Sequence, residues 1–270
     1  MKITFIGGGN MATALIGGML AQGFEPADLT VIEPSGDKRA ELQASFGVHT
    51  QAALAGGLPA CDVILLAIKP QSMKEVAGEL AGKIGGQLVI SIAAGIQVSS
   101  LASWLGGHDN IVRVMPNTPA LVRAGMSGLF APAAVSEASR AVAERILKAV
   151  GDTLWLADES MMDAVTAVSG SGPAYVFYFI ESLMEGAAKL GFNRADAKQL
   201  AYATFNGAVK LALDSQDDAA TLRTKVTSKG GTTEAALKQM EAAQVKAGIV
   251  AGIEAANTRG QELGKELGGQ

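Results

Sequence analysis

The stretch Lys2-Ile3-Thr4-Phe5-Ile6-Gly7-Gly8-Gly9-Asn10-Met11-Ala12 decides the fold of the first half of this 270-residue chain. Its first five residues are mostly β-branched or aromatic, which predicts a short buried strand. Next comes G-x-G-x-x-A, and an apolar run typical of a helix continues to about Gln22. In this setting Gly7 allows a tight turn, Gly9 lets the backbone approach a pyrophosphate, and Ala12 keeps helix and strand close. The stretch predicts a dinucleotide-binding unit, and the alternative is a glycine-rich turn with a purely structural role.

Further strands of a parallel sheet follow in order. Apolar or β-branched runs predict strands at residues 29–32, 63–68, 88–92, 111–115, 126–130 and 153–156, with a helix at 136–150. Continuous apolar runs are typical of strands that are buried on both faces. We therefore expect a doubly wound, Rossmann-type α/β domain over residues 1–157.

Small or polar residues follow the ends of these strands, where open α/β sheets bind their ligands. Lys69 follows one strand and is a candidate cofactor contact, although a plain surface lysine explains it equally well. Ala94 lies in a run of small residues that leaves room for a flat ring. Asn117 presents a polar group at the same edge, and its alternative role is ordinary turn chemistry.

The residues after the second strand carry conflicting signals about the nucleotide. Glu33 ends that strand, and an acidic residue at this point usually binds the adenosine ribose hydroxyls and favours NAD over NADP. Ser35, Lys38 and Arg39 follow it and would instead suit a 2′-phosphate. A solvated helix start is a third interpretation of the same residues.

The second half of the chain is predicted to be helical. The strand pattern stops after about residue 158, and Ser169-Gly170-Ser171-Gly172-Pro173 reads as a break before helices at 173–190, 194–213 and 243–263. The first of these is apolar nearly all round in its first half, so it must be buried in its own domain or against another subunit. We expect residues 158–270 to form an all-helical domain that builds a dimer.

Within this half lies Val226-Thr227-Ser228-Lys229-Gly230-Gly231-Thr232-Thr233-Glu234, between two stretches of helical periodicity. The glycines allow a tight bend, and the free N–H groups of the helix that follows favour an anion. The threonine hydroxyls add donors. The loop is therefore a candidate seat for a carboxylate or phosphate, or else an ordinary helix joint capped by a threonine.

Composition excludes several classes of protein. The net charge is −4, which leaves no broad basic surface for nucleic acid or anionic membranes. Cys61 is the one cysteine, so an internal disulfide is excluded and a reducing compartment is indicated. No signal peptide precedes the first strand, and no apolar run approaches the ~20 residues that span a bilayer. We expect a cytoplasmic protein. His49 and His108 lack metal-ligand spacing, so we expect no metal site and place each histidine on an exposed loop or strand end.

Five motifs occur in an order and spacing that resemble the pyrroline-5-carboxylate reductases. They are the G-x-G-N-M-A loop, Ala67-Ile68-Lys69-Pro70, Met115-Pro116-Asn117-Thr118-Pro119, Ser169-Gly170-Ser171-Gly172-Pro173-Ala174-Tyr175 and residues 226–233. The resemblance covers nearly the whole chain. It implies that NAD(P)H reduces the C=N bond of 1-pyrroline-5-carboxylate to give L-proline, the last step of proline synthesis.

The resemblance also assigns residues. It places cofactor contacts at Ile6, Gly7, Gly8, Gly9, Asn10 and Met11 and at Ala67, Ile68, Lys69 and Pro70. It places the substrate on the motif that begins at Val226, with its carboxylate on the backbone of Gly231, Thr232 and Thr233. The hydroxyl of Thr233 corresponds to the family's hydroxyl near the ring nitrogen. Family members form dimers interlocked through the helical domain, and often rings of dimers. For this chain the resemblance implies a homodimer and a decamer of five dimers. Glu33 departs from the pattern, since NADPH-preferring relatives often carry a small or basic residue there.

Two other functions stay open at this point. A 3-hydroxyacid dehydrogenase of the same two-domain plan needs a lysine on the helical domain, and Lys189, Lys198 and Lys210 are available. A non-catalytic redox sensor would bind the dinucleotide and signal through its dimer, but it has no need of a second anion seat.

Overall fold

The computed structural model describes residues 1–268 of the chain and divides into two compact units. The first runs to Ser171 and takes in the end of the chain from Ala256, and the second comprises Gly172–Ala255. The chain therefore crosses between the units twice. The boundary that we expect after residue 157 separates the dinucleotide-binding domain from the helical domain. The two compact units do not test it, so it stays a prediction.

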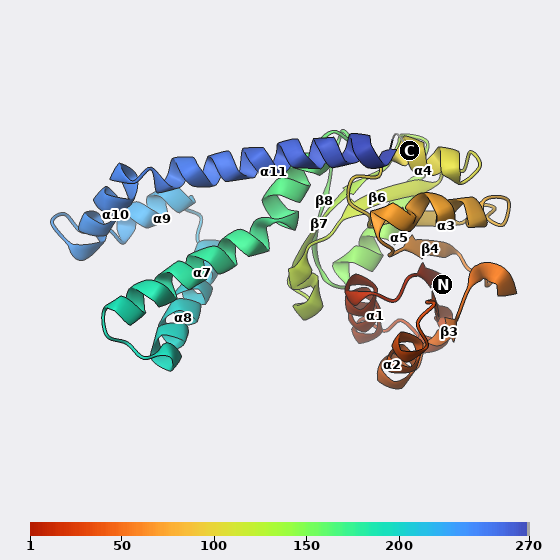
Figure 1. Ribbon diagram of the computed structural model, residues 1–270, viewed down its shortest axis with the longest axis horizontal. Helices are drawn as coiled ribbons and strands as arrows, with labels where there is room; N and C mark the ends of the chain where they lie inside the picture. Colours follow the sequence, from red (N-terminus) through yellow and green to blue (C-terminus); the bar gives the residue numbers. More distant parts are fainter. Residues whose placement is uncertain (269–270) are drawn as a thin grey trace. The chain divides into compact units, whose positions relative to one another are not determined.

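A single eight-stranded sheet forms the centre of the first unit (Figure 1). Its strands are β1 (Ile3–Ile6), β2 (Leu29–Ile32), β3 (His49–Gln51), β4 (Val63–Leu66), β5 (Leu88–Ser91), β6 (Ile111–Met115), β7 (Gly125–Phe130) and β8 (Gly151–Trp155). Their order is β3-β2-β1-β4-β5-β6-β7-β8, and β6 and β7 form the one antiparallel pair of this sheet. The first six strands have the Rossmann order, in which ligands bind where the winding reverses, between β1 and β4. The predicted fold class is confirmed.

Helices cover both faces of this sheet because alternate strand residues point to opposite sides. Ile3 and Phe5 belong to one core with residues of α1 (Asn10–Ala21), α2 (Gly36–Phe46) and α5 (Glu137–Lys148). Ile64 and Leu66 belong to the other core, with α3 (Met73–Leu80) and α4 (Val98–Trp104). Short 3₁₀ turns, η1 (Pro26–Asp28), η2 (Leu54–Gly56), η3 (Pro70–Ser72) and η4 (Thr118–Val122), complete the connections.

Some element boundaries differ from those predicted. β4 and β5 end at Leu66 and Ser91, because the residues that follow turn away to form loops. β3 and α4 were not predicted from the sequence. β3 is a three-residue edge strand with no buried residue, and α4 is only seven residues long, so neither has room for a clear hydrophobic period.

The passage into the second unit is nearly continuous helix. α6 (Met161–Val165) leads into the π-helical turn η5 (Thr166–Gly170), and α7 (Gly172–Lys189) begins after Ser171. The N–H of Ser171 donates to the Thr166 carbonyl at 2.8 Å, the i to i+5 bond of a π-bulge. The predicted break at residues 169–173 is confined to a bend at Ser171, and the residues before it form a π-helical turn.

The second unit consists of helices only within the described residues. α7 is followed by α8 (Arg194–Leu213), α9 (Ala219–Lys225), α10 (Thr232–Ala242) and α11 (Val245–Gly268), which begins in this unit and ends in the first. α7 and α8 pack on each other, yet their buried apolar residues are only Ile180, Ala197 and Ala201. Phe177 is 62% exposed and Tyr178 70%. The apolar face of α7 is thus not buried within one chain. None of the described helices has the length and apolar character needed to cross a membrane.

Candidate active site

Gly7 and Gly9 of the dinucleotide motif have different physical roles. Gly7 has φ +97°, and a Cβ there would lie 2.6 Å from the carbonyl oxygen of Ala67. The backbone of this turn therefore packs against the turn after β4 so closely that only glycine fits. Gly9 has an ordinary extended conformation, and a Cβ added to it would meet no described atom within 4 Å. The space beside Gly9 is therefore open.

The start of α1 is an uncapped helix end directly after this loop. Gly9 makes no side-chain capping bond, and the first turn of α1 holds no acidic residue. The N–H groups of Asn10 and Met11 have no hydrogen-bond partner among the described residues. Unpaired N–H groups and the positive end of the helix dipole suit a diphosphate. The residues present therefore fit a dinucleotide at the switch point of the sheet.

Glu33 lies beside this loop and is held there by two backbone donors. Its Oε2 accepts the N–H of Gly8 at 2.9 Å, and its Oε1 accepts the N–H of Ser35 at 2.9 Å. A carboxylate oxygen accepts more than one hydrogen bond, so both remain able to accept from a ribose hydroxyl. The fixed negative charge would repel a 2′-phosphate.

The basic residues after Glu33 differ in availability. Nη1 of Arg39 donates to the carbonyl oxygens of Glu33 and Pro34, each at 2.7 Å. The guanidinium of Arg39 is thus hydrogen-bonded to the backbone of the turn. Lys38 has no side-chain partner among the described residues and is the remaining cation for a 2′-phosphate. The Oγ of Ser35 accepts the N–H of Lys38 at 3.4 Å as the cap of α2.

The remaining predicted cofactor contacts fall at neighbouring strand ends. Ile6 ends β1, and Ala67 and Ile68 follow β4, with the Ala67 N–H bonded to the Ile6 carbonyl at 2.8 Å. Lys69 is exposed, has no ion-pair partner within residues 1–268, and precedes Pro70 at the start of η3. Ala94 lies half-buried in the loop after β5.

Asn117 is engaged by the protein itself. Its Oδ1 accepts the N–H of Met126 at 2.8 Å, and its Nδ2 donates to the carbonyl and the Oγ of Ser169, both at 3.2 Å. These contacts tie η4, β7 and η5 together. They favour the turn-chemistry alternative for Asn117, while its role as a cofactor contact stays a prediction.

In the second unit, the predicted substrate loop is the connection between α9 and α10. Val226 caps the C-terminus of α9 and is 61% exposed. Gly230 has φ +72°, which makes the bend possible, and α10 begins at Thr232 without a side-chain cap. The N–H groups of Thr232 and Thr233 have no partner among the described residues. These open donors are compatible with an anion, and the substrate seat itself stays a prediction.

One predicted donor of this loop needs correction. The N–H of Gly231 donates to the Ser228 carbonyl at 3.0 Å, so this bond closes the turn and the N–H does not point to an open ligand position. A Cβ added to Gly231 would lie 3.1 Å from the Ser228 carbonyl oxygen, so a glycine at this position suits the tight turn. The open backbone donors at this seat are those of Thr232 and Thr233.

The carboxylate of Glu234 folds back onto the loop that precedes this seat. Its Oε2 accepts the N–H of Gly230, and its Oε1 pairs with Lys238 at 2.9 Å. Lys238, and after it the Gly230 N–H, lower the pKa of Glu234 below its ordinary value. Because the carboxylate is turned back and compensated by Lys238, it opposes an incoming anion less than an unpaired acid would.

The cysteine, the histidines and the lysines that the sequence singled out are placed as follows. No cluster of three or more His, Cys, Asp or Glu side chains that would suit a metal is present within residues 1–268. Burial raises the pKa of the Cys61 thiol, which keeps it protonated and unreactive. His49 is exposed as expected, whereas His108 is half-buried. Lys189 is paired with Glu185 at 2.6 Å on an exposed helix face.

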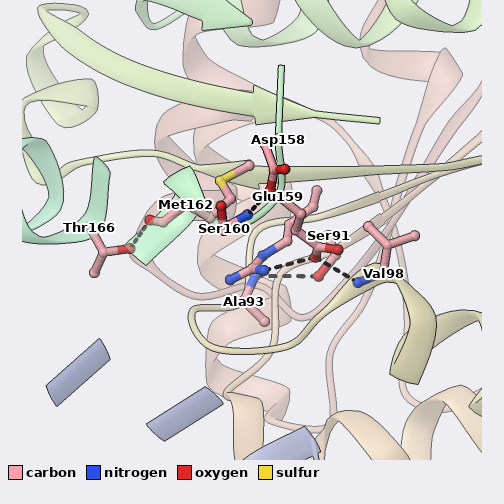
Figure 2. A network of polar contacts seen from close by, with 9 residues as sticks. Ser91, Ala93, Val98, Asp158, Glu159, Ser160, Met162 and Thr166 are labelled. Atoms are coloured by element: carbon pink, nitrogen blue, oxygen red, sulfur yellow. Dashed lines mark hydrogen bonds and ion pairs between the residues drawn. The ribbon is translucent and has the colours of Figure 1, made fainter. Parts of the chain in front are cut away.

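An ion pair near the sheet was not predicted from the sequence. Arg113 in β6 is 6% exposed, and its Nη1 donates to Oε1 of Glu159 at 2.8 Å (Figure 2). The one available signal was a charged residue inside the apolar run of β6, because a buried arginine needs a partner. The sequence does not indicate which carboxylate supplies it.

Comparison with known proteins identifies the class of protein to which the chain belongs. Residues 2–95 match the family model described as NADP oxidoreductase coenzyme F420-dependent, and residues 159–263 match the one described as pyrroline-5-carboxylate reductase dimerisation. A nucleotide-binding oxidoreductase unit is thus joined to a helical region that makes a homo-oligomer. The chain is 46% identical to a pyrroline-5-carboxylate reductase of Pseudomonas aeruginosa over 99% of its length and 98% of the relative's. It belongs to the pyrroline-5-carboxylate reductase family, whose members are NAD(P)H-dependent oxidoreductases.

Solved structures agree with this assignment. A pyrroline-5-carboxylate reductase from Coxiella burnetii superposes with a TM-score of 0.91 at 40% identity and covers 97% of this chain and 98% of its own. A Plasmodium falciparum pyrroline carboxylate reductase with NADP bound has a TM-score of 0.88 at 29% identity, covering 98% of each chain.

Proposed function

We propose that this chain carries out the reaction for which its family is named, the reduction of 1-pyrroline-5-carboxylate to L-proline with NAD(P)H. The observation that supports this most directly is the pair of uncapped helix starts, one on each unit. α1 offers unpaired N–H groups after Gly9, and α10 offers those of Thr232 and Thr233. A reductase of this kind needs two anion seats, one for the pyrophosphate of the cofactor and one for the carboxylate of the substrate.

Each seat has a defined task in the reaction. Residues 6–11 hold the pyrophosphate, with Ala67–Pro70 beside it, and Ala94 leaves room for the nicotinamide ring. When bound, NAD(P)H supplies the hydride. The N–H groups of Thr232 and Thr233 hold the substrate carboxylate, and Val226 contacts the ring. The Thr233 hydroxyl oxygen accepts a hydrogen bond from the N–H of the protonated ring nitrogen, which favours the protonated, more electrophilic imine. Because so few ionisable groups take part, most of the rate gain comes from orientation.

A substrate comparison tests this proposal against its alternatives. Purified protein is mixed with NADH or NADPH and 1-pyrroline-5-carboxylate, and separately with NAD⁺ or NADP⁺ and a panel of 3-hydroxyacids. We expect cofactor oxidation in the first mixture and no reduction in the second. Turnover of a 3-hydroxyacid would favour the dehydrogenase alternative, and cofactor binding without any turnover would favour a redox sensor.

The nucleotide preference depends on Glu33, and we propose that NADH is the better cofactor. Replacing Glu33 by Gln keeps an acceptor oxygen for the Gly8 N–H and removes the charge. A partly exposed repulsion of this kind is worth about 1 kcal/mol, so the ratio of kcat/KM for NADPH to that for NADH should rise about five- to tenfold. Glu33→Ser should shift the ratio in the same direction. Steady-state kinetics with both nucleotides measure this, and a ratio that does not change in either variant would mean that the carboxylate does not face the ribose.

The helical region assembles the homo-oligomer, and we propose that the exposed apolar side chains of α7, which include Phe177, Tyr178 and Leu183, form its contact surface. A cavity of about 640 Å³ on the second unit is lined by Tyr178, Phe179 and Leu183 of α7 and by Ile249 and other residues of α11. A Cβ added to Gly248 or Gly252 of α11 would meet no described atom within 4 Å, so another helix can approach them closely. We propose a dimer at this surface and a decamer of five dimers as the complete assembly, located in the cytoplasm.

Phe177→Glu should break this assembly without unfolding the chain. Phe177 is 62% exposed in the single chain, so its own unit does not depend on it. A symmetric dimer loses the burial of two phenylalanines and must bury two charges, which should weaken association by at least about 100-fold. Analytical ultracentrifugation measures the change. Leu154→Glu, at a residue 50% exposed on β8 of the first unit, is the matched control and should leave the sedimentation coefficient unchanged. A Phe177→Glu protein of wild-type mass would place the interface elsewhere.

A further inference from the structure

One carboxylate oxygen joins three separate parts of the first unit. Oε1 of Glu159 accepts the N–H of Val98, the first residue of α4, at 2.8 Å. The same oxygen accepts Nη1 of Arg113 in β6 at 2.8 Å. Figure 2 shows these contacts converging on Glu159, with Ser91 and Ala93 of the neighbouring strand end close by. We call these three residues, Val98, Arg113 and Glu159, the Glu159 clamp.

The Glu159 clamp fixes the far end of the loop between β5 and α4. The near end of this loop is tied to β4, because the Ile92 N–H donates to the Leu66 carbonyl at 3.2 Å. Its middle turns at Gly95, which has φ +78°, and Ala93 and Ile96 are buried on either side. The Val98 N–H then ties the end of the loop to Glu159. Ala94, which we propose beside the nicotinamide ring, lies between these two ties.

Packing alone does not hold the clamp in place. The side chains of Arg113 and Glu159 are 7% and 23% exposed, and both line a cavity of about 290 Å³ together with Gln97 and Asp163. Since one side of the pair faces this cavity, the position of the carboxylate depends on its two hydrogen bonds. A charge-assisted bond to a backbone N–H is stronger than a neutral one and has a stricter geometry.

We infer that Glu159 is a positioning residue for the cofactor: through the Val98 N–H it sets the loop that carries Ala94, and thereby the seat of the nicotinamide ring. The inference rests on the proposed function in one respect, that Ala94 contacts the nicotinamide. The adenine half of the cofactor, near Glu33, does not depend on the clamp.

Val98→Pro is the sharpest test because it removes a single N–H. Proline is well accepted as the first residue of a helix, and Gln97 before it has φ −75° and ψ 151°, which proline permits. Arg113 and Glu159 keep each other as partners in this variant, so no charge is left unpaired. Val98→Ala, which keeps the N–H and loses part of the side chain, is the matched control. Affinities for NADH and for ADP-ribose, which lacks the nicotinamide, are measured by calorimetry.

We expect Val98→Pro to bind NADH about tenfold more weakly than Val98→Ala does, while the two bind ADP-ribose equally. Its kcat should fall by a similar factor. Glu159→Gln, which keeps an acceptor oxygen, should stay within about threefold of wild type for NADH. Equal NADH affinities in the two Val98 variants would overturn the inference, and so would an equal loss for NADH and ADP-ribose, which would indicate general damage. If the wild type fails to reduce pyrroline-5-carboxylate but the Val98 variants still separate NADH from ADP-ribose, the proposed function fails and the positioning role stands.

Discussion

Gly9→Val should abolish nucleotide binding in a protein that still folds. Gly9 has φ −70° and ψ −178°, an extended conformation that valine adopts readily, and an added Cβ would meet no described atom within 4 Å. The added methyl groups would therefore occupy ligand space and not the core. They would hold the pyrophosphate away from the N–H groups at the start of α1. Losing two or more charge-assisted hydrogen bonds of about 1.5–3 kcal/mol each weakens NADH binding by more than about 100-fold.

Two glycine substitutions make this result interpretable. Gly86→Val is the matched control, because a Cβ at Gly86 would also meet no described atom within 4 Å, and Gly86 lies away from the strand ends of the predicted cofactor contacts. It should leave both NADH affinity and the melting temperature nearly unchanged. Gly7→Val should instead lower the melting temperature, because its Cβ would lie 2.6 Å from the Ala67 oxygen at a φ of +97°. If Gly9→Val binds NADH as the wild type does, the dinucleotide does not cross this loop.

Thr232→Pro should have the second large effect, on the substrate. Thr232 is the first residue of α10, where proline fits, and Gly231 before it has an extended ψ of 175°. The substitution removes one of the two open N–H donors and leaves the helix in place. Losing one hydrogen bond to a carboxylate costs about 1.5–3 kcal/mol, or about 10- to 150-fold in kcat/KM for pyrroline-5-carboxylate. NADH affinity should not change, because we propose that the nucleotide binds on the other unit.

Thr232→Ala is the matched control, since it removes the side chain and keeps the N–H. It should stay within about threefold of wild type if the backbone is the donor. Thr233→Ala keeps its N–H as well but loses the hydroxyl that we assign to the ring nitrogen, so its kcat/KM should fall about 10- to 150-fold. Equal kcat/KM values in Thr232→Pro and Thr232→Ala would mean that the start of α10 is only a helix joint.

The fold was predictable because its signals are local. The strands of the sheet are short apolar runs, and the glycine motif between the first strand and the first helix is typical of the Rossmann strand order. The helix Arg194–Leu213 was also predicted with its observed bounds, and Asn193 caps its start. Elements that are too short to show a hydrophobic period, such as β3, could not be predicted. The π-helical turn at residues 166–170 was also not predicted, because it ends in a stretch rich in glycine and serine.

The backbone geometry of the candidate site was predictable from the sequence, and its side-chain contacts were less so. The glycines and the helix starts follow from backbone rules, and those rules hold at Gly7 and Gly230. The contacts of Asn117 and Gly231 depend on groups that the local pattern does not specify, Ser169 in one case and the Ser228 carbonyl in the other. Arg113 and Glu159 are 46 residues apart, and only the folded sheet brings them together. Side-chain partners of this kind depend on tertiary structure, which periodicity does not encode.

The stoichiometry of the reaction tests most directly whether the chain reduces 1-pyrroline-5-carboxylate to L-proline. Wild-type protein is incubated with NADH and 1-pyrroline-5-carboxylate, and the NADH oxidised and the L-proline formed are measured in the same sample. We expect one proline for each NADH oxidised by the wild type, and neither proline formation nor NADH oxidation by Gly9→Val. NADH oxidation without proline, or no oxidation with either nucleotide, would contradict it.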